Sequence, residues 1–321
     1  MAPRSAHLRR VAPRTGQLGC SCSPSRSGVG VSSRPLSARR ARGGDHGLVR
    51  ATVSFDYVEH LVRVPVQLGD QSHGFLVDTG IGITVISSTL ASRSDVEYTG
   101  ETFTARRMSG QQVETPLVRL PQLRLGRFIV SGHVAGVADL GPAAGPNGFA
   151  GILGPAFFDG HVVTTDPASL ILSVEPRADF KAVGWTIPLE VRRDGPSLDL
   201  FTTLVLPNGR EICVEVDTGS GTLILDSRFM PDCGVSAEQP GVITRTGTDE
   251  TGYQWTRLWA TLSGGVHLAA APETVQTEVR VQFQDIIHDG LIGTHYLTRY
   301  RTSLDVTGGR LILAPRTPLA D

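Results

Sequence analysis

Hydrophobic and polar residues alternate along much of the chain from residue 53 onwards. The alternation is clearest at 53–57, 62–68 and 279–283, where every second side chain is apolar. A period of two places these side chains on one face of an extended strand. Turn-forming residues bound such runs, as at Gly69-Asp70 and Pro207-Asn208-Gly209. The pattern therefore predicts a series of short, half-buried β-strands.

Apolar residues also cluster in short runs in the second half of the chain, which predicts strands at 187–191, 198–206 and 211–216. Helical periodicity is confined to brief stretches, with short helices predicted at 88–93, 155–158 and 294–300. The fold class predicted from these patterns is mainly β.

Two stretches share one unusual arrangement. Each is an apolar strand that runs into Asp-Thr-Gly, with a second glycine two positions further on and another apolar strand after it. The first motif is Asp78-Thr79-Gly80, and the second, in the other half of the chain, is Asp217-Thr218-Gly219. One such motif on its own is typical of an ordinary turn at the end of a strand. Only the presence of two copies in equivalent contexts indicates a specific structure.

Two further landmarks hold the same spacing in both halves. Gly151-Ile152-Leu153-Gly154 follows Asp78 at the same distance along the chain at which Gly290-Leu291-Ile292-Gly293 follows Asp217. Asp166 and Asp305 then follow these segments, again at equal distances, and each stands ahead of a closing apolar run. Matched spacing of this kind indicates an internal repeat. We predict two copies of one lobe, at 51–178 and 179–321.

Composition limits the classes of partner. The chain has 321 residues, of which 40% are hydrophobic, and a formal net charge of −1. A length and composition of this kind allow real hydrophobic cores. The near-neutral charge argues against a nucleic-acid or membrane-surface partner. No apolar run is long enough to span a membrane, so no transmembrane helix is expected.

Residues 1–50 differ from the rest of the chain. They contain ten Arg and a single acidic residue, Asp45, together with many Ser, Pro and Gly. Such a segment buries too little apolar surface to offset its ordering entropy, so we predict a disordered tail. It lacks the apolar stretch that a signal peptide requires. A cytoplasmic protein is expected, with secretion as the open alternative.

At the paired motifs the chain resembles the aspartic proteases of the pepsin and retropepsin clan. In that family each lobe supplies one Asp-Thr-Gly loop, and a later segment of two apolar residues and Gly passes behind it. Here those segments are Ile152-Leu153-Gly154 and Leu291-Ile292-Gly293. The resemblance covers about residues 52–316, and the lobes look like short retropepsin-type lobes. It implies a bilobal fold of two β-barrel-like lobes related by a pseudo-twofold axis.

The resemblance also implies the site. Asp78 and Asp217 would be the catalytic carboxyl groups, facing each other between the lobes. Two carboxylates about 3 Å apart cannot both ionise, so they share one proton. One then takes a proton from water while the other hydrogen-bonds the substrate carbonyl. The supporting residues of the two loops are Thr79, Gly80, Thr218, Gly219 and Ser220.

The two loops differ at one position. Ser220 follows the second Asp-Thr-Gly, whereas Ile81 follows the first. A hydroxyl that reaches a carboxylate stabilises its charged form. We therefore predict that Asp217 acts more often as the base and that Asp78 more often holds the proton. In family terms, hairpins that cover the site fall near 106–112 and 244–253.

The resulting hypothesis is that the chain is an aspartic endopeptidase. It would act on peptides or proteins as a monomer, without a cofactor or metal. The alternatives are a non-catalytic peptide-binding or scaffold module on the same fold, and lobes that pair between molecules. A dinucleotide loop is disfavoured because Val85 and Ile224 stand where its third glycine would be. The nine His include no His-Glu-x-x-His motif, so a metal site is not predicted.

Overall fold

Three β-sheets organise the described part of this computed structural model, which comprises residues 50–141, 148–248 and 252–316. All of these residues belong to one compact unit, Arg39–Asp321. The other unit, Met1–Ala38, lies outside the described residues, and so does nearly all of the predicted tail. The predicted fold class, mainly β, is confirmed.

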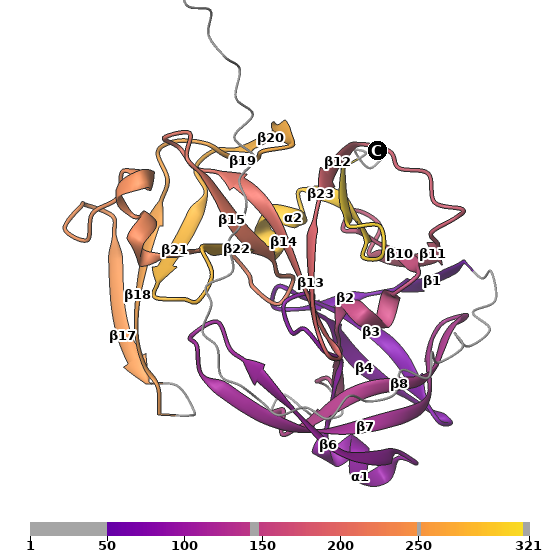
Figure 1. Cartoon of the computed structure of the whole chain (residues 1–321). Helices are drawn as coiled ribbons and strands as arrows, with labels where there is room; N and C mark the ends of the chain where they lie inside the picture. Colours follow the sequence, from indigo (N-terminus) through magenta and orange to yellow (C-terminus); the bar gives the residue numbers. More distant parts are fainter. Residues whose placement is uncertain (1–49, 142–147, 249–251, 317–321) are drawn as a thin grey trace, which may run out of the picture. The chain divides into compact units, whose positions relative to one another are not determined.

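The first sheet takes its strands from the first half of the chain, coloured indigo to magenta in Figure 1. Val62, Val64, Val66 and Leu68 are all buried, as their alternation predicts. In spatial order the strands are β2 (Asp56–Val58), β3 (Leu61–Leu68), β4 (Gln71–Val77), β9 (Gly151–Leu153), β5 (Val85–Ser87), β8 (Phe128–Ala138), β7 (Gln112–Leu125) and β6 (Glu97–Arg106).

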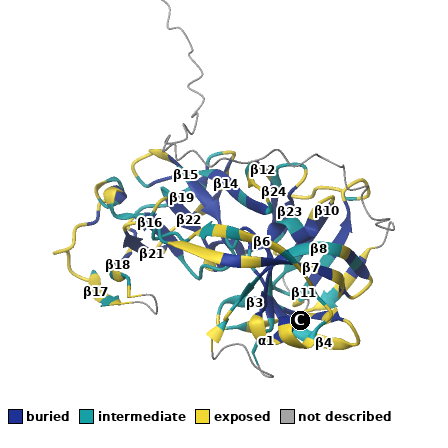
Figure 2. Cartoon of the chain, turned by 60° about the horizontal axis from the view of Figure 1, so that its bottom comes forward, coloured by how far each residue is buried: buried dark blue, intermediate teal, exposed yellow. Residues whose placement is uncertain are grey.

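The second sheet takes its strands from the second half of the chain. Figure 2 shows buried residues in dark blue along its middle strands and exposed residues in yellow at one edge. In order the strands are β17 (Ile243–Thr248), β18 (Gln254–Thr261), β21 (Arg280–Gln284), β16 (Leu223–Asp226), β22 (Gly290–Ile292), β15 (Glu211–Val216), β14 (Ser197–Val205), β19 (Val266–Leu268) and β20 (Ala271–Gln276), while β13 (Glu190–Asp194) also pairs with β14.

The third sheet joins strands from both halves. Its order is β1 (Ala51–Ser54), β11 (Ile171–Pro176), β10 (His161–Asp166), β23 (Tyr300–Asp305), β24 (Arg310–Pro315) and β12 (Trp185–Pro188). At its centre β10 pairs with β23, and Thr164 of the first half lies opposite Ser303 of the second. Their buried hydroxyl oxygens are 2.7 Å apart, which satisfies both groups in the core.

Equivalent strands pair in the same way in both halves. Phe75 of β4 lies opposite Gly151 of β9, and Val214 of β15 lies opposite Gly290 of β22, in both cases in parallel. A Cβ atom on Gly151 would lie 2.2 Å from the ring of Phe75, so the close approach of these strands requires glycine there. The repeat in sequence spacing therefore corresponds to a repeat in strand register.

Helices are few and short among the described residues, as predicted. The helix α1 spans Ser88–Arg93, and its N-cap Ser87 accepts a hydrogen bond from the Leu90 N–H. The helix α2 spans Thr294–Leu297 and ends before the predicted residue 300, because Tyr300 already belongs to β23. Short 3-10 helices lie at Pro155–Phe158, Ser227–Phe229 and Pro231–Cys233.

One predicted strand is wrong. Residues 187–191 do not form a single strand, because the chain changes sheets at Leu189. The pairing of β12 with β24 ends at Pro188 and Arg310, and the Leu189 N–H donates to the carbonyl of the adjacent Gly309. Glu190 then begins a new pairing with Phe201 of β14. A stretch of β-forming residues does not reveal such a change of partner.

The proposed boundaries of the two lobes stay a prediction. The strand β11 ends at Pro176 and β12 begins at Trp185, so the predicted division after residue 178 falls between strands. Within the described residues, no helix is long and apolar enough to cross a membrane.

Candidate active site

The two Asp-Thr-Gly loops lie directly against each other, where β4 and β15 end. The Thr79 N–H donates to Thr218 Oγ1, and the Thr218 N–H donates to Thr79 Oγ1, both over 3.0 Å. Each hydroxyl also donates to a carbonyl of the other strand: Thr79 Oγ1 to Val216 over 2.5 Å, and Thr218 Oγ1 to Val77 over 3.0 Å. Four reciprocal hydrogen bonds therefore hold the two loops in one relative position.

The glycines of these loops let the two carboxyl groups converge. A Cβ atom on Gly80 would lie 2.3 Å from Asp217 Oδ1, and one on Gly219 would lie 2.4 Å from Asp78 Oδ2. No side chain fits at either position without displacing a carboxyl group. The Gly80 N–H donates to Asp78 Oδ1 and the Gly219 N–H to Asp217 Oδ1, each over 2.8 Å. Each carboxyl group is thus oriented by its own loop and faces the other loop.

The later glycine segments support the loops from behind. The Asp78 N–H donates to the Leu153 carbonyl of β9, and the Asp217 N–H donates to the Ile292 carbonyl of β22, both over 3.1 Å. A Cβ atom on Gly293 would lie 2.4 Å from the Ser220 carbonyl oxygen, so this segment also passes too close to its loop for a larger residue. The supports are equivalent in the two halves.

The electrostatics of the carboxyl groups are asymmetric. The pKa of Asp78 is raised to about 8, first because burial disfavours its charged form and then because the charge of Asp217 is close. Backbone N–H groups of Gly80 and Gly219 oppose this rise. Asp217 instead receives a hydrogen bond of 2.6 Å from Ser220 Oγ at its Oδ2 atom. Such a bond favours the ionised carboxylate.

The position equivalent to Ser220 offers no hydroxyl in the first loop. Ile81 stands there and packs against the small apolar cluster of Ile83, Val85 and Leu117. The surroundings of Asp78 are therefore more apolar than those of Asp217. The predicted division of roles between Asp78 and Asp217 stays a prediction, and the Ser220 hydroxyl is the structural difference on which it depends.

Two hairpins were predicted near the site. Residues 107–111 form the tip between β6 and β7, where the Arg107 N–H donates to the Gln111 carbonyl. The Met108 carbonyl accepts a hydrogen bond of 2.9 Å from the Ile287 N–H, so this tip contacts the second half of the chain. The other hairpin joins β17 to β18, but residues 249–251 at its tip lie outside the described residues.

The structure brings all seven predicted site residues together in the paired loops: Asp78, Thr79, Gly80, Asp217, Thr218, Gly219 and Ser220. Three polar residues near these loops are not predicted from the sequence. His60 Nε2 lies 3.1 Å from the Gly219 carbonyl oxygen. A Cβ atom on Gly82 would lie 3.2 Å from Asp199 Oδ1. Burial, and then the charges of Asp217 and Asp78, raise the pKa of Glu215. Of the three, only Glu215 is conspicuous in the sequence, because it is a charged residue between the apolar residues of a predicted strand.

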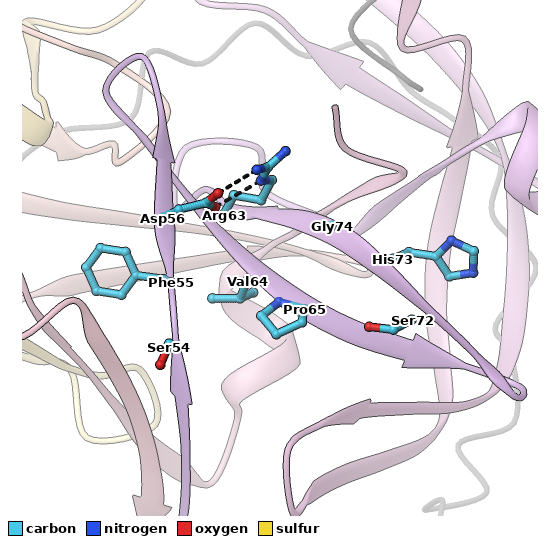
Figure 3. A pocket seen from close by; sticks show the side chains of 9 residues that line it. All are labelled: Ser54, Phe55, Asp56, Arg63, Val64, Pro65, Ser72, His73 and Gly74. Carbon is cyan, nitrogen blue, oxygen red and sulfur yellow. Dashed lines mark hydrogen bonds and ion pairs between the residues drawn. The ribbon is translucent and has the colours of Figure 1, made fainter. Parts of the chain in front are cut away.

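The surface near β3 and β4 carries a separate cavity of about 380 Å³ (Figure 3). Its wall includes an ion pair in which Arg63 Nε donates to Asp56 Oδ1 over 2.9 Å. Neither Asp78 nor Asp217 lines it, so it is not the site formed by the loops. In the part of the chain that the structure describes, no group of three or more His, Cys, Asp or Glu could hold a metal ion.

Comparison with known families agrees with this geometry. Residues 64–157 match the family model described as aspartyl protease. The matched segment contains the first Asp-Thr-Gly loop and the glycine segment behind it. Over this segment the match supports the predicted resemblance to retropepsin-like aspartyl proteases. No curated protein matches the chain.

Proposed function

We propose that this chain, whose residues 64–157 match the aspartyl protease family model, is an aspartic endopeptidase acting on peptide or protein substrates. The observation that carries the proposal is the pair of cross-bonded loops, which direct the carboxyl groups of Asp78 and Asp217 at each other. The raised pKa of Asp78 supports it, because a shared proton requires one carboxyl group that stays protonated near neutral pH.

The proposed reaction assigns opposite roles to the two carboxyl groups. Asp217, ionised and hydrogen-bonded by Ser220, takes a proton from a water molecule held between the two groups. The water oxygen attacks the carbonyl carbon of the peptide, while protonated Asp78 donates its proton to the carbonyl oxygen. The resulting tetrahedral diol collapses when its C–N bond breaks. The leaving nitrogen receives the proton from Asp217, and ionised Asp78 takes a proton back from one diol hydroxyl, which leaves a carboxylic acid, an amine and the starting state of the pair.

The equivalent register in the two halves supports a duplicated, bilobal protease with lobes at 51–178 and 179–321. Both Asp-Thr-Gly loops belong to one chain, so the proposed active species is a monomer. The tip of the β6–β7 hairpin, which contacts Ile287, is the proposed cover of the site. No metal or cofactor takes part in the proposed reaction, and a cytoplasmic location stays part of the proposal.

The test is incubation of the full-length protein with a peptide library, with and without a statine-type analogue of the tetrahedral intermediate. We expect the protein to cleave some of the peptides and the analogue to suppress this cleavage, because the analogue imitates the diol between the two carboxyl groups. Mass spectrometry identifies the cleaved bonds. Binding of peptides without any cleavage would instead identify a non-catalytic peptide-binding module.

The substitution Ser220→Ala should move the acidic limb of the kcat/KM profile to higher pH by about one unit. The Ser220 hydroxyl stabilises the charged form of Asp217, so its loss makes protonation of the pair easier. The basic limb is expected near pH 8 in both proteins, because protonated Asp78 is lost there.

The measurement is a pH–rate profile on one peptide. Ser92→Ala, which removes an exposed hydroxyl on α1, is the control and should leave both limbs in place. The reciprocal variant Ile81→Ser should move the acidic limb to lower pH. An unmoved acidic limb in Ser220→Ala, with otherwise normal activity, excludes the hydroxyl as the source of the asymmetry.

A further inference from the structure

A third carboxyl group lies beside the proposed catalytic pair. Glu215 belongs to β15, two positions before Asp217, and only 5% of it is exposed. Successive strand residues point to opposite faces, so Glu215 does not share the core-facing side of Val214 and Val216. The charges of Asp217 and Asp78 both act on it and raise its pKa. Glu215 is therefore part of the immediate surroundings of the pair.

The equivalent position in the first half carries an apolar residue. Leu76 precedes Asp78 as Glu215 precedes Asp217. Leu76 lies opposite Ile152 of β9, and Glu215 lies opposite Leu291 of β22. A buried carboxyl group carries a desolvation cost that leucine avoids. Because the strand pairing is equivalent in both halves, packing alone does not require a carboxyl group at this place.

Polar residues continue outward from Glu215. The His288 Nε2 atom lies 3.6 Å from Glu215 Oε2, and the imidazole ring packs edge-on against Phe201 at 5.1 Å. Burial lowers the pKa of His288 to about 4, so it is neutral and supplies no positive charge. Asp199 adds a second acidic group, while the guanidinium of Arg192 lies over the Phe201 ring at 3.8 Å. We call Glu215, His288, Asp199 and Ser197 the Glu215 cluster.

The cluster reaches the first Asp-Thr-Gly loop. A Cβ atom on Gly82 would lie 2.4 Å from Ser197 Oγ and 3.2 Å from Asp199 Oδ1. The Leu198 N–H also donates to the Gly82 carbonyl over 3.1 Å. At its other end, His288 follows Ile287, the residue that hydrogen-bonds the tip of the β6–β7 hairpin. The cluster therefore connects the loop after Asp78 with the segment that the hairpin contacts.

We propose that Glu215 is a specificity residue that selects a lysine or arginine side chain next to the scissile bond. The proposal rests on the proposed endopeptidase activity. The Glu215 cluster carries two carboxyl groups beside the two of the catalytic pair, and Arg192 is the cation that acts on them. A cationic substrate side chain would supply further positive charge to this acidic group of residues.

The free protein and the complex then differ in the state of Glu215. Burial first, and the neighbouring carboxyl groups second, raise the pKa of Glu215 well above its usual range. Its neutral form is therefore favoured when no substrate cation is near. An ammonium or guanidinium group beside it would favour its ionised form, and the pair would form with release of one proton. An uncharged side chain of similar length gains nothing from this change.

The test compares two peptides that differ only in lysine or norleucine next to the scissile bond. The full-length protein should cleave the lysine peptide with a kcat/KM at least about tenfold higher, a typical effect of one paired charge. Glu215→Leu, which copies Leu76, should invert this ratio, and the isosteric Glu215→Gln should abolish the preference. Glu211→Gln makes the same charge change at an exposed position of the same strand and should leave the ratio unchanged.

Equilibrium binding of both peptides, measured by fluorescence anisotropy, makes the test independent of turnover. The ratio between the two peptides is the quantity compared, so a general loss of activity does not imitate the effect. An unchanged ratio in both Glu215 variants, in cleavage and in binding, overturns the specificity role while leaving the peptidase intact. A wild-type protein that binds with the expected preference but cleaves neither peptide overturns the proposed function instead.

Discussion

Replacement of Asp78 or Asp217 by asparagine is expected to lower kcat on a cleavable peptide by at least about 10³-fold, the range that a general acid or base supplies. Each carboxyl group has a separate task in the proposed reaction, and an amide can neither accept the proton of water nor donate a carboxylic proton. Because the two groups act as a unit, the double variant should be hardly worse than either single variant.

The substitution Asp78→Asn should not destabilise the fold near neutral pH. The pKa of Asp78 is about 8 in the folded protein and about 3.9 in an unfolded chain. Between these values the folded state keeps a proton that the unfolded state has lost, so stability declines as the pH rises from about 4 to about 8. Asn at position 78 removes this decline, and its unfolding midpoint at pH 7 should equal or exceed that of the wild type.

Peptide cleavage and urea unfolding at pH 5 and pH 7 measure both effects. Asp95→Asn alters an exposed carboxyl group after α1 and serves as the control, with activity and stability both unchanged. Either single variant that retained about a tenth of the wild-type kcat would contradict the two-carboxylate reaction. A midpoint at pH 7 that dropped in Asp78→Asn would contradict the assignment of the raised pKa.

The loops of the site can be predicted from the sequence because they are local. Asp78-Thr79-Gly80 and Asp217-Thr218-Gly219 are continuous segments, and their spacing to Gly151 and Gly290 repeats. Alternation predicts β3 and the run 279–283 equally directly. Such features depend on residues close together in the chain, where the period of two is visible.

Features that depend on distant pairing are not visible in this way. The sheet that joins both halves exists because β10 pairs with β23. The residues of either strand do not predict which strand will pair with it. The change of sheet at Leu189 depends on Gly309, which lies far away along the chain. Glu215 gains its surroundings from Phe201 and Leu291 on two other strands. Its charge is apparent in the sequence, but its place beside Asp217 and Asp78 is not.

Adding a methyl group at Gly80 or Gly219 is expected to lower kcat/KM by about 10²-fold or more. The new Cβ atom of Gly80→Ala would lie 2.3 Å from Asp217 Oδ1, so the carboxyl group must move by a sizeable part of an ångström. A shift of about 1 Å in a reacting group can cost about 10²-fold in rate. In Gly219→Ala the displaced group is Asp78, through its Oδ2 atom at 2.4 Å, so both variants should fail alike.

The control for these variants is Gly160→Ala. Gly160 has a positive φ of 79° and open space around it, so alanine there strains the backbone without touching the site. Its stability should fall by about 1 kcal/mol while kcat stays at the wild-type value. Circular dichroism and urea unfolding separate loss of fold from loss of geometry. A Gly80→Ala protein with unaltered kcat/KM would show that Asp217 is free to move aside, and that the close approach of the two loops does not position the carboxyl groups for the reaction.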